Sequence, residues 1–290
     1  MTSKAGHPFI SIVTPSLNQA QYLGEAMESV RQQRYPRHEH LVLDGGYTDG
    51  SAVLLKRASH ASIGSQLWRR SGSDGGQSAA LNEGFARASG DIIGWLNADD
   101  RYRPGCFEKV ANTFALYPEI DVLCGDYTLI DAAGKHPAMR REIDFNHFVL
   151  RYHRVLYIPT TADFFRRRIF DDGHFLTNSL QYAMDLDFFL RLADAGYQFR
   201  CLARVLADFR IHTASKSIEF IDRQRAEHRS IILRETPLAQ RFQSMRVRSA
   251  AATLLQVPAL MRYGEKLLRG FYLPYEIPEE MMHARERRQL

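Results

Sequence analysis

The sequence lacks several features that mark secreted, membrane-spanning and zinc-binding proteins. Its 290 residues include only three cysteines, Cys106, Cys124 and Cys201, which match neither a zinc-ligand spacing nor a disulfide framework. No uncharged apolar run is long enough to cross a bilayer, and residues 1–7 lack the apolar core of a signal peptide. These absences favour a protein of the reducing cytoplasm.

Two common phosphate-binding signatures are also missing. The chain has neither a G-x-G-x-x-G fingerprint nor a P-loop, which argues against a nicotinamide-dependent dehydrogenase and a P-loop phosphotransferase. The net charge is +5, yet no dense basic block accompanies a nucleic-acid-binding motif. We therefore expect no nucleic-acid partner, and the positive charge fits an anionic small substrate or an anionic membrane surface.

A regular alternation of strand and helix patterns is present up to about residue 217. Apolar runs at 9–15, 40–43, 66–68, 92–96 and 122–124 predict strands, with helical patterns between them. This rhythm predicts an α/β fold with a mostly parallel, doubly wound sheet flanked by helices. Residues beyond 218 are mostly helix-forming, with three prolines as breaks, and they predict a helical C-terminal extension.

Polar segments follow three of these strands. They are Ser16 to Asn18, Asp44 to Asp49, and Asp99-Asp100. Because the carboxyl ends of parallel strands meet at one edge of a sheet, the repetition predicts a ligand cleft there. Asn18 has a second interpretation as the N-cap of the next helix, with Gln21 as its capping-box partner.

The two adjacent carboxylates after the buried strand at 92–96 need a partner. Asp99 and Asp100 repel each other unless a cation or a proton intervenes. A hard divalent ion with oxygen ligands, Mn²⁺ or Mg²⁺, fits and could bridge them to a diphosphate. The alternative is a solvated Asp-Asp turn that caps the helix beginning near Pro104.

The motifs, taken in order, resemble family 2 glycosyltransferases over about residues 8–217. The matching segments are Thr14 to Asn18, Asp44 to Ser51, Asp74 to Gln77, Asn82 to Gly84, Gly90-Asp91, Asn97 to Asp100, Ala183 to Asp185 and Arg210 to His212. The resemblance implies a GT-A fold, a nucleotide-diphosphate sugar donor, a divalent metal and inversion at the anomeric carbon. Asn97 stands where the family often has Asp, so it is not expected to be an anionic ligand, but its carbonyl oxygen can still coordinate a metal.

The resemblance also assigns donor-binding residues. Asp44 is placed to accept a hydrogen bond from a pyrimidine imide N–H, which favours a UDP- or dTDP-linked sugar. The full nucleotide-sugar set is Thr14, Pro15, Ser16, Asn18, Asp44, Asp74, Gln77, Asn97 and Asp99. Asp44 as a turn residue and Asp74 as a helix cap are the structural alternatives.

Metal binding and catalysis are expected from the remaining acids. Asp99, Asp100 and His212 form the predicted metal set, with Asp100 as the preferred direct ligand. Asp185 is the predicted general base that takes the proton of the acceptor hydroxyl, and Asp187 is the alternative base. A carboxylate that only favours the N-terminus of a helix is the structural interpretation of Asp185.

Together these features predict a metal-dependent inverting glycosyltransferase of cell-surface polysaccharide synthesis, with a glycan or lipid-linked acceptor. The expected domain covers residues 8–217, with a nucleotide-sugar half at 8–126, an acceptor half at 127–217, and the extension at 218–290. Basic and apolar residues alternate over 241–269, which indicates either peripheral contact with the inner face of the membrane or a helical subdomain with solvated arginines. The alternative functions are a sugar nucleotidyltransferase and an inactive sugar-nucleotide-binding module.

Overall fold

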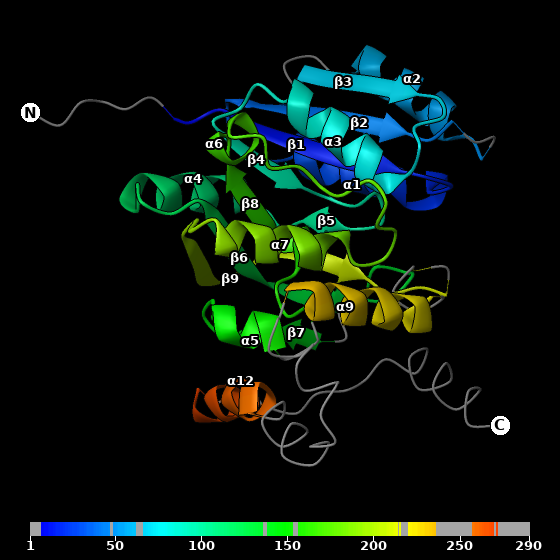
Figure 1. The fold of residues 1–290 in the computed structure, drawn as a ribbon. Coiled ribbons are helices and arrows are strands. Elements are labelled where there is room, and N and C mark those ends of the chain that lie inside the picture. The colour runs from blue at the N-terminus through cyan, green and yellow to red at the C-terminus, as the bar shows by residue number, and fades with distance from the viewer. Residues whose placement is uncertain are drawn as a thin grey trace, which may run out of the picture.

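One mixed sheet organises the described part of the chain. The computed structural model describes residues 7–46, 49–61, 66–135, 138–152, 156–213, 215, 220–235, 257–269 and 271. Within these residues nine strands form a sheet in the order β3-β2-β1-β4-β8-β6-β9-β5, and β7 pairs with β6 (Figure 1). The strands are β1 Ile10–Ser16, β2 His38–Asp44, β3 Gln66–Ser71, β4 Ile92–Trp95, β5 Arg101–Tyr102, β6 Val122–Ile130, β7 Ala138–Arg140, β8 Asp163–Arg166 and β9 Phe199–Arg210.

The first half of the sheet is parallel, as the strand and helix alternation predicts. β1 lies between β2 and β4 and is parallel to both, and β2 is parallel to β3. All seven residues of β1 and all four of β4 are buried, which explains their nearly continuous apolar runs.

The second half of the sheet is mixed. β8 is antiparallel to both β4 and β6, while β6 and β9 are parallel. The short β5 is antiparallel to β9. Through β8 and β9, the chain after residue 160 therefore returns to the loop that follows β4.

Helices cover both faces of this sheet. Their bounds are α1 Ala20–Arg31, α2 Ser51–Ala61, α3 Gln77–Arg87, α4 Cys106–Leu116, α5 His147–Tyr152, α6 Arg168–Asp171, α7 Met184–Asp194, α9 Ile221–Glu235 and α12 Val257–Leu268, with a 3₁₀ turn at Thr160–Ala162. Side chains of α3, α5, α6 and α7 join one core cluster, and those of α1 and α4 join another. The sheet is thus doubly wound, as predicted.

The beginning of α1 corrects one expectation. The helix is preceded by Gln19, and no side chain of that residue caps it. Asn18 has a positive φ of 55°, so the predicted capping box with Gln21 does not form. Instead, Asp49 Oδ2 accepts a hydrogen bond from the Ala20 N–H at 2.9 Å. The acceptor comes from the next polar loop because the ends of β1 and β2 are neighbours.

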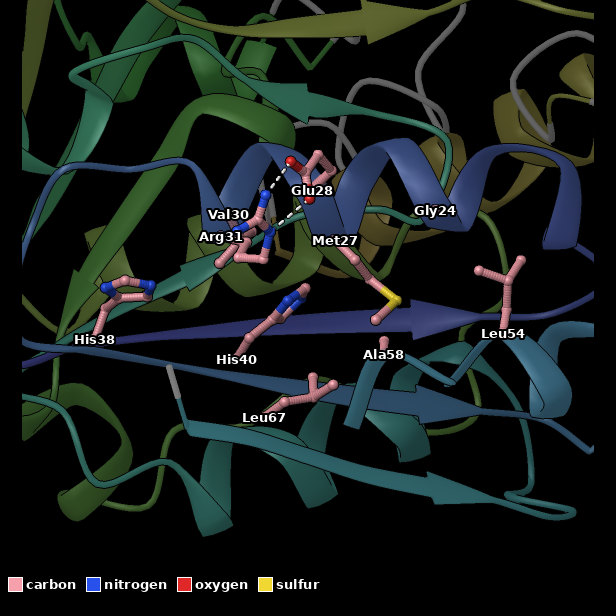
Figure 2. Close-up of a pocket in the computed structure, with 10 residues that line it drawn as sticks. All are labelled: Gly24, Met27, Glu28, Val30, Arg31, His38, His40, Leu54, Ala58 and Leu67. Atoms are coloured by element: carbon pink, nitrogen blue, oxygen red, sulfur yellow. Dashed lines mark hydrogen bonds and ion pairs between the residues drawn. The ribbon is translucent and has the colours of Figure 1, made fainter. Parts of the chain in front are cut away.

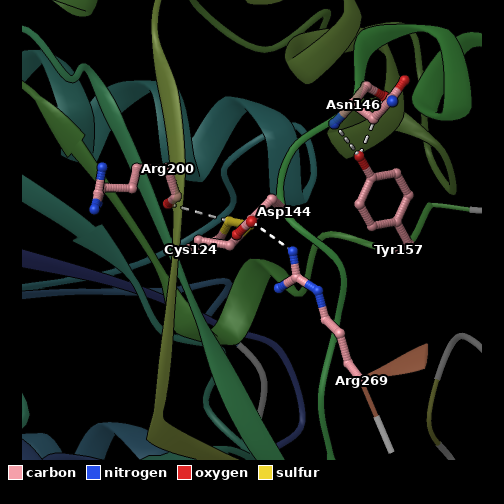
Figure 3. The surroundings of a disulfide bond; sticks show 7 residues. Cys124, Asp144, Asn146, Tyr157, Arg200 and Arg269 are labelled. Atoms are coloured by element: carbon pink, nitrogen blue, oxygen red, sulfur yellow. Dashed lines mark hydrogen bonds and ion pairs between the residues drawn. A yellow bond between two sulfur atoms is a disulfide. The ribbon is translucent and has the colours of Figure 1, made fainter. Parts of the chain in front are cut away.

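A disulfide contradicts the expectation drawn from the cysteine spacing. Cys124 and Cys201 are joined although 77 residues separate them (Figure 3). They are register partners on the adjacent parallel strands β6 and β9, with 4.6 Å between their Cα atoms. Sequence spacing could not show this pairing because it depends on which strands become neighbours. Cys106 is free and buried.

The C-terminal helix α12 packs through its charged side. Arg262 and Lys266, only 8% and 7% exposed, both bond to the Glu142 carboxylate, whereas Leu260 is 68% and Leu268 90% exposed. The expectation of solvated arginines is therefore wrong for Arg262, and residues 241–256 of the predicted basic segment lie outside the described residues. Among the helices that are described, none has the length and apolar character needed to cross a bilayer.

Candidate active site

The predicted polar loops meet at the carboxyl edge of β1, β2, β3 and β4. Ser16 is the register partner of Asp44, and Asp44 is the partner of Ser71 at the end of β3. The arrowheads of β2 and β3 point to the same side in Figure 1. This arrangement provides the ligand edge expected for an open α/β sheet.

Asp44 is held by its neighbours at this edge. Its side chain is 1% exposed, and its Oδ2 atom accepts the Ser71 hydroxyl at 2.6 Å and the Gly46 N–H at 3.3 Å. Both described hydrogen bonds fall on one oxygen, which fixes the plane of the carboxylate. Its turn-forming role and its predicted role in base recognition are therefore compatible, because Oδ1 is not used by either bond.

The loops that follow β2 and β3 lie against each other. Gly46 has a φ of 83°, and a Cβ atom there would lie 2.7 Å from the Gly72 Cα atom, so no larger residue fits. A Cβ on Gly45 would lie 3.6 Å from Asp74 Oδ2. Asp74 Oδ1 accepts the Gly76 N–H at 2.9 Å, which forms a turn before α3 but leaves Asp74 beside the Asp44 loop.

The predicted residues of β1 are divided between the core and the edge. Thr14 is buried and its hydroxyl bonds to His40 Nε2 at 2.8 Å, so its side chain faces away from the polar loops. Burial lowers the pKa of His40 to about 3, which keeps its imidazole neutral. Ser16 Oγ is buried and has no hydrogen-bond partner among the described residues, whereas Asn18 is exposed.

His40 also lines a pocket that lies apart from this edge. The pocket, about 160 Å³ in volume, lies between α1, α2 and the sheet face of β2 and β3 (Figure 2). Its walls are mainly apolar, with Met27, Leu54 and Leu67 among them. None of the predicted donor, metal or base residues lines it.

Asn97 has its side-chain amide committed to structure. Its Oδ1 atom accepts the Trp95 indole N–H at 3.0 Å and a Gln77 amide N–H at 3.3 Å, and its Nδ2 donates to Asp100 Oδ2 at 3.2 Å. Both acceptor positions of Oδ1 are thus in use. The amide thus ties α3, β4 and the acidic turn together.

Asp100 is enclosed by hydrogen-bond donors. It is 2% exposed and accepts bonds from the Thr161 hydroxyl, from the Arg210 N–H at 2.8 Å, and from Asn97. Burial, followed by the negative charge of Asp99, raises the pKa of Asp100 well above its usual range. The carboxyl links β4, the turn before β8, and β9, so its contacts are those of a structural junction.

Asp99 and His212 form a pair at the surface of this junction. Asp99 Oδ2 lies 3.1 Å from His212 Nε2, and their side chains are 19% and 7% exposed. The Tyr22 ring of α1 packs against the imidazole, with 4.8 Å between ring centroids. The structure therefore brings together two of the three predicted metal ligands and turns the third, Asp100, inward.

A buried ionic network supports this pair and was not predicted. Arg210 is 2% exposed, donates to the Asp99 carbonyl at 2.8 Å, and pairs with Glu25 at 2.5 Å. Arg101 also pairs with Glu25 and bonds Asp208 at 2.7 Å. The sequence signals Arg210 only as a neighbour of His212, and nothing in the spacing of Glu25 on α1 indicates the contact.

The two candidate bases on α7 have different surroundings. Asp187 is 1% exposed and bonds to Thr177, Arg191 and Arg234, as expected for a structural carboxylate. Asp185 is half-buried, and its described hydrogen bond is to the Leu186 N–H at 2.8 Å. Burial, and then the negative charge of Glu227, raise the pKa of Asp185 to about 6. Asp185 is therefore the less constrained of the two carboxylates.

The turn that leads into α7 borders the donor loops. A Cβ on Gly76 would lie 3.7 Å from Gln181 Oε1, and the Ser78 hydroxyl of α3 donates to the Leu180 carbonyl at 3.2 Å. Asp185 is thus carried by a segment in contact with the first turn of α3, which begins three residues after Asp74. Asp163, the first residue of β8, is fully buried nearby, and neither of its carboxylate oxygens has a hydrogen-bond partner among the described residues.

The donor set at the acidic turn fits a divalent cation only in part. Among the residues that the structure describes, no three His, Cys, Asp or Glu side chains are grouped closely enough to hold a metal ion. Asp99 and His212 supply one oxygen and one nitrogen that face each other at 3.1 Å. Two such ligands fit a cation whose remaining coordination positions are filled by water and substrate oxygens.

The sheet order and the position of this edge define an α/β fold of the GT-A glycosyltransferase type. The chain is similar in fold to a mannosyltransferase of Pyrobaculum calidifontis solved with GDP-Man and Mn²⁺, with a TM-score of 0.62, 18% identity, and coverage of 80% of this chain and 66% of that one. It is also similar to S. aureus TarS solved with UDP-GlcNAc, with a TM-score of 0.60, 16% identity, and coverage of 78% and 66%.

Sequence comparison assigns the chain to a family. The model of glycosyl transferase family 2 matches residues 11–173, and the chain belongs to this family. An O-antigen biosynthesis protein of Myxococcus xanthus is 34% identical over 146 residues, 50% of this chain and 11% of that protein. An uncharacterized glycosyltransferase of Rickettsia typhi is 29% identical over 224 residues, 71% of this chain and 65% of that protein. The chain thus spans less than two thirds of the length of either relative.

Proposed function

We propose that this protein is an inverting glycosyltransferase that moves a sugar from a nucleotide-diphosphate donor to a hydroxyl of a glycan or lipid-linked acceptor. The observation that carries the proposal is the meeting of three features at one sheet edge: the Asp44 loop, the Asp99–His212 pair, and the turn before Asp185. They match the three requirements of the reaction, which are a held nucleotide, a stabilised leaving group and a base.

Recognition of the donor base is proposed for the Asp44 loop. Asp44 has its Oδ2 fixed by Ser71 and Gly46, so Oδ1 is oriented to accept an imide N–H of uracil or thymine. Ser16 and Asp74 border the same loop. TarS was solved with UDP-GlcNAc, which is consistent with a uridine donor. We therefore propose a UDP- or dTDP-linked sugar.

The leaving diphosphate is proposed to bind beside Asp99 and His212. These two side chains would hold Mn²⁺ or Mg²⁺, the former being the ion bound in the similar mannosyltransferase. When bound, the cation supplies Lewis-acid stabilisation of the charge on the diphosphate. Asp100 contributes by fixing the turn through Arg210 and Thr161.

Asp185 is proposed to take the proton of the acceptor hydroxyl. With a pKa of about 6 it is mostly ionised at pH 7, yet basic enough to accept a proton in the transition state. Attack on the anomeric carbon from the face opposite the diphosphate gives inversion. Asp187 does not fit this role because Arg191 and Arg234 occupy its carboxylate.

Polysaccharide or O-antigen synthesis is the proposed setting, by similarity to the Myxococcus relative. A lipid-linked acceptor would place the protein at the inner face of the membrane. We propose that such contact uses the exposed apolar side chains of α12, Leu260, Leu267 and Leu268, because Arg262 and Lys266 are bound to Glu142. Flotation with anionic lipid vesicles tests this, and Leu267→Glu should reduce it.

A donor screen tests the enzymatic proposal. The protein is incubated with UDP-, dTDP- and GDP-linked sugars and Mn²⁺, and nucleoside diphosphate release is measured with and without EDTA. Release from one donor, lost in Asp185→Asn and suppressed by EDTA, is expected. Release of pyrophosphate from a nucleoside triphosphate and a sugar phosphate would instead indicate a nucleotidyltransferase. Donor binding without any turnover, across a broad acceptor panel, would indicate an inactive binding module.

A further inference from the structure

The segment that enters α7 takes its hydrogen-bond acceptor from another helix. The residue before α7 is Ala183, and no side chain of its own caps the helix. The Glu227 carboxylate of α9 accepts the N–H groups of Tyr182 at 2.7 Å and Ala183 at 2.9 Å, and that of Gln181 at 3.2 Å. A single side chain thus satisfies three consecutive amides that would otherwise lack a partner at the start of the helix.

Further contacts fix α9 on the same turn. Gln224 Nε2 donates to the Tyr182 carbonyl at 3.2 Å, and Arg223 donates to the Tyr182 hydroxyl at 3.3 Å. Arg234 pairs with Asp187, one turn into α7. One turn after Glu227, Ile231 is 1% exposed and belongs to the main core cluster. Helix α9 therefore contacts the α7 segment both before Asp185, at residues 181–183, and after it, at Asp187, and Ile231 packs α9 into the core.

Two acids interact with Asp185. Beyond the effect of burial, the negative charge of Glu227 on α9 raises the pKa of Asp185, and the charge of Asp185 in turn raises the pKa of Asp163 on β8. On α7 itself, the charge of Asp187 is matched by Arg191 and Arg234. Both of these arginines bond to Asp187, and the described hydrogen bond of the Asp185 side chain, with the Leu186 N–H, favours the ionised carboxylate that Glu227 disfavours.

We propose that Glu227 is a positioning residue of the transferase, which holds the turn carrying Asp185 by accepting the backbone N–H groups of residues 181–183. The inference rests on the proposed role of Asp185 as the base. It makes α9 part of the proposed active site (Figure 1). This helix lies beyond the predicted domain at residues 8–217. Glu227 touches no reacting atom and acts through the backbone and charge of the 181–185 segment.

The test compares Glu227→Gln with Asp222→Asn, a matched control on the same helix. Asp222 is an exposed acid whose described ion pair is with Arg225, so its substitution removes the same charge without touching the turn. The Asp185 carboxyl is titrated by ¹³C NMR, with Asp185→Asn used to assign its signal, and sugar transfer is measured from pH 5 to 8.5. Glu227→Asp, which keeps the charge but shortens the reach, is the second variant.

Glu227→Gln should lower the titration midpoint of Asp185 by at least about half a pH unit and move the acid limb of the rate profile by the same amount. Asp222→Asn should leave both unchanged. Glu227→Asp should keep the midpoint but lower kcat several-fold, with donor Kd unchanged. An unmoved midpoint in folded Glu227→Gln, or an unchanged kcat in Glu227→Asp, overturns the proposal. An active Asp185→Asn variant refutes instead the base assignment on which it rests.

Discussion

Replacing Asp185 by Asn separates the chemical role of this residue from its structural one. The amide has the same shape and still accepts the Leu186 N–H, which the carboxylate accepts at 2.8 Å. It cannot take a proton at neutral pH. Loss of a general base lowers transfer by about 10²–10⁴-fold, while donor affinity should stay within a few-fold because the donor loops are untouched.

The same substitution has an unusual expected effect on stability. Burial raises the pKa of Asp185 from its ordinary 3.8 to about 6, so ionisation is less favourable in the folded chain than in the unfolded one. The contribution of the Asp185 carboxyl to the free energy of unfolding is therefore fully present below about pH 3.8, and it is lost as the pH rises through about 6. The shift corresponds to at most about 3 kcal/mol at pH 8, and partial exposure reduces it.

Asp185→Asn should consequently be more stable than the wild type at pH 8, with the difference vanishing near pH 4. Urea unfolding at the two pH values measures this, and the transfer rate on the same preparations measures the chemistry. A residue that serves only the N-terminus of α7 gives the reverse result, a loss of up to about 1 kcal/mol with kcat intact. Near-normal transfer by the folded variant would refute the base assignment.

Four further outcomes test the remaining assignments. Asp44→Ala should raise the donor KM more than it lowers kcat, because a contact to the base is similar in ground and transition states; calorimetry of donor binding checks it. Asp99→Ala should fold but lose Mn²⁺-stimulated turnover, whereas persistence of that stimulation excludes Asp99 as a ligand. Asp100→Ala should abolish transfer together with about 2–4 kcal/mol of stability in urea, since it leaves the Arg210 N–H and the Thr161 hydroxyl without their acceptor. Thiol titration of the unfolded, non-reduced protein should find one free cysteine, and three would exclude the Cys124–Cys201 bond.

The parallel half of the sheet could be predicted because its signals are local. The apolar runs that form β1 and β4 are buried along their whole length, and each ends at the residue where polar side chains begin. That Asp44 and Asp99 share an edge follows from parallel pairing alone. The family resemblance added an ordered set of motifs, and the family match over residues 11–173 confirms it.

Contacts that cross long stretches of chain were not predictable in the same way. Glu227 lies 44 residues from Ala183, and the Arg210–Glu25 pair spans 185 residues. No periodicity links such residues, because their contact depends on how α9, β9 and α1 pack. The Cys124–Cys201 bond could not be predicted for the same reason, because the two cysteines become neighbours only through the pairing and register of β6 and β9.

The orientation of α12 was missed for a different reason. A helix with one apolar and one basic side is expected to bury the apolar side. Here Glu142 lies beneath the helix and accepts both Arg262 and Lys266, so the basic side is the buried one. A pattern within the helix could not reveal an acid some 120 residues earlier in the chain.

The acids of the site show that partners, rather than sequence position, assign the roles of neighbouring carboxylates. Asp100 and Asp187 are almost fully buried, and each accepts hydrogen bonds from several donors. Their carboxylates therefore hold neighbouring elements together. Asp99 is adjacent to Asp100, and Asp185 lies in the same helical turn as Asp187, yet both Asp99 and Asp185 are partly exposed. Each catalytic candidate is thus flanked by a structural acid that fixes the backbone beneath it. Substituting the structural member should reduce stability and activity together, whereas substituting the exposed member should reduce activity without reducing stability, and this difference distinguishes the two classes within each pair.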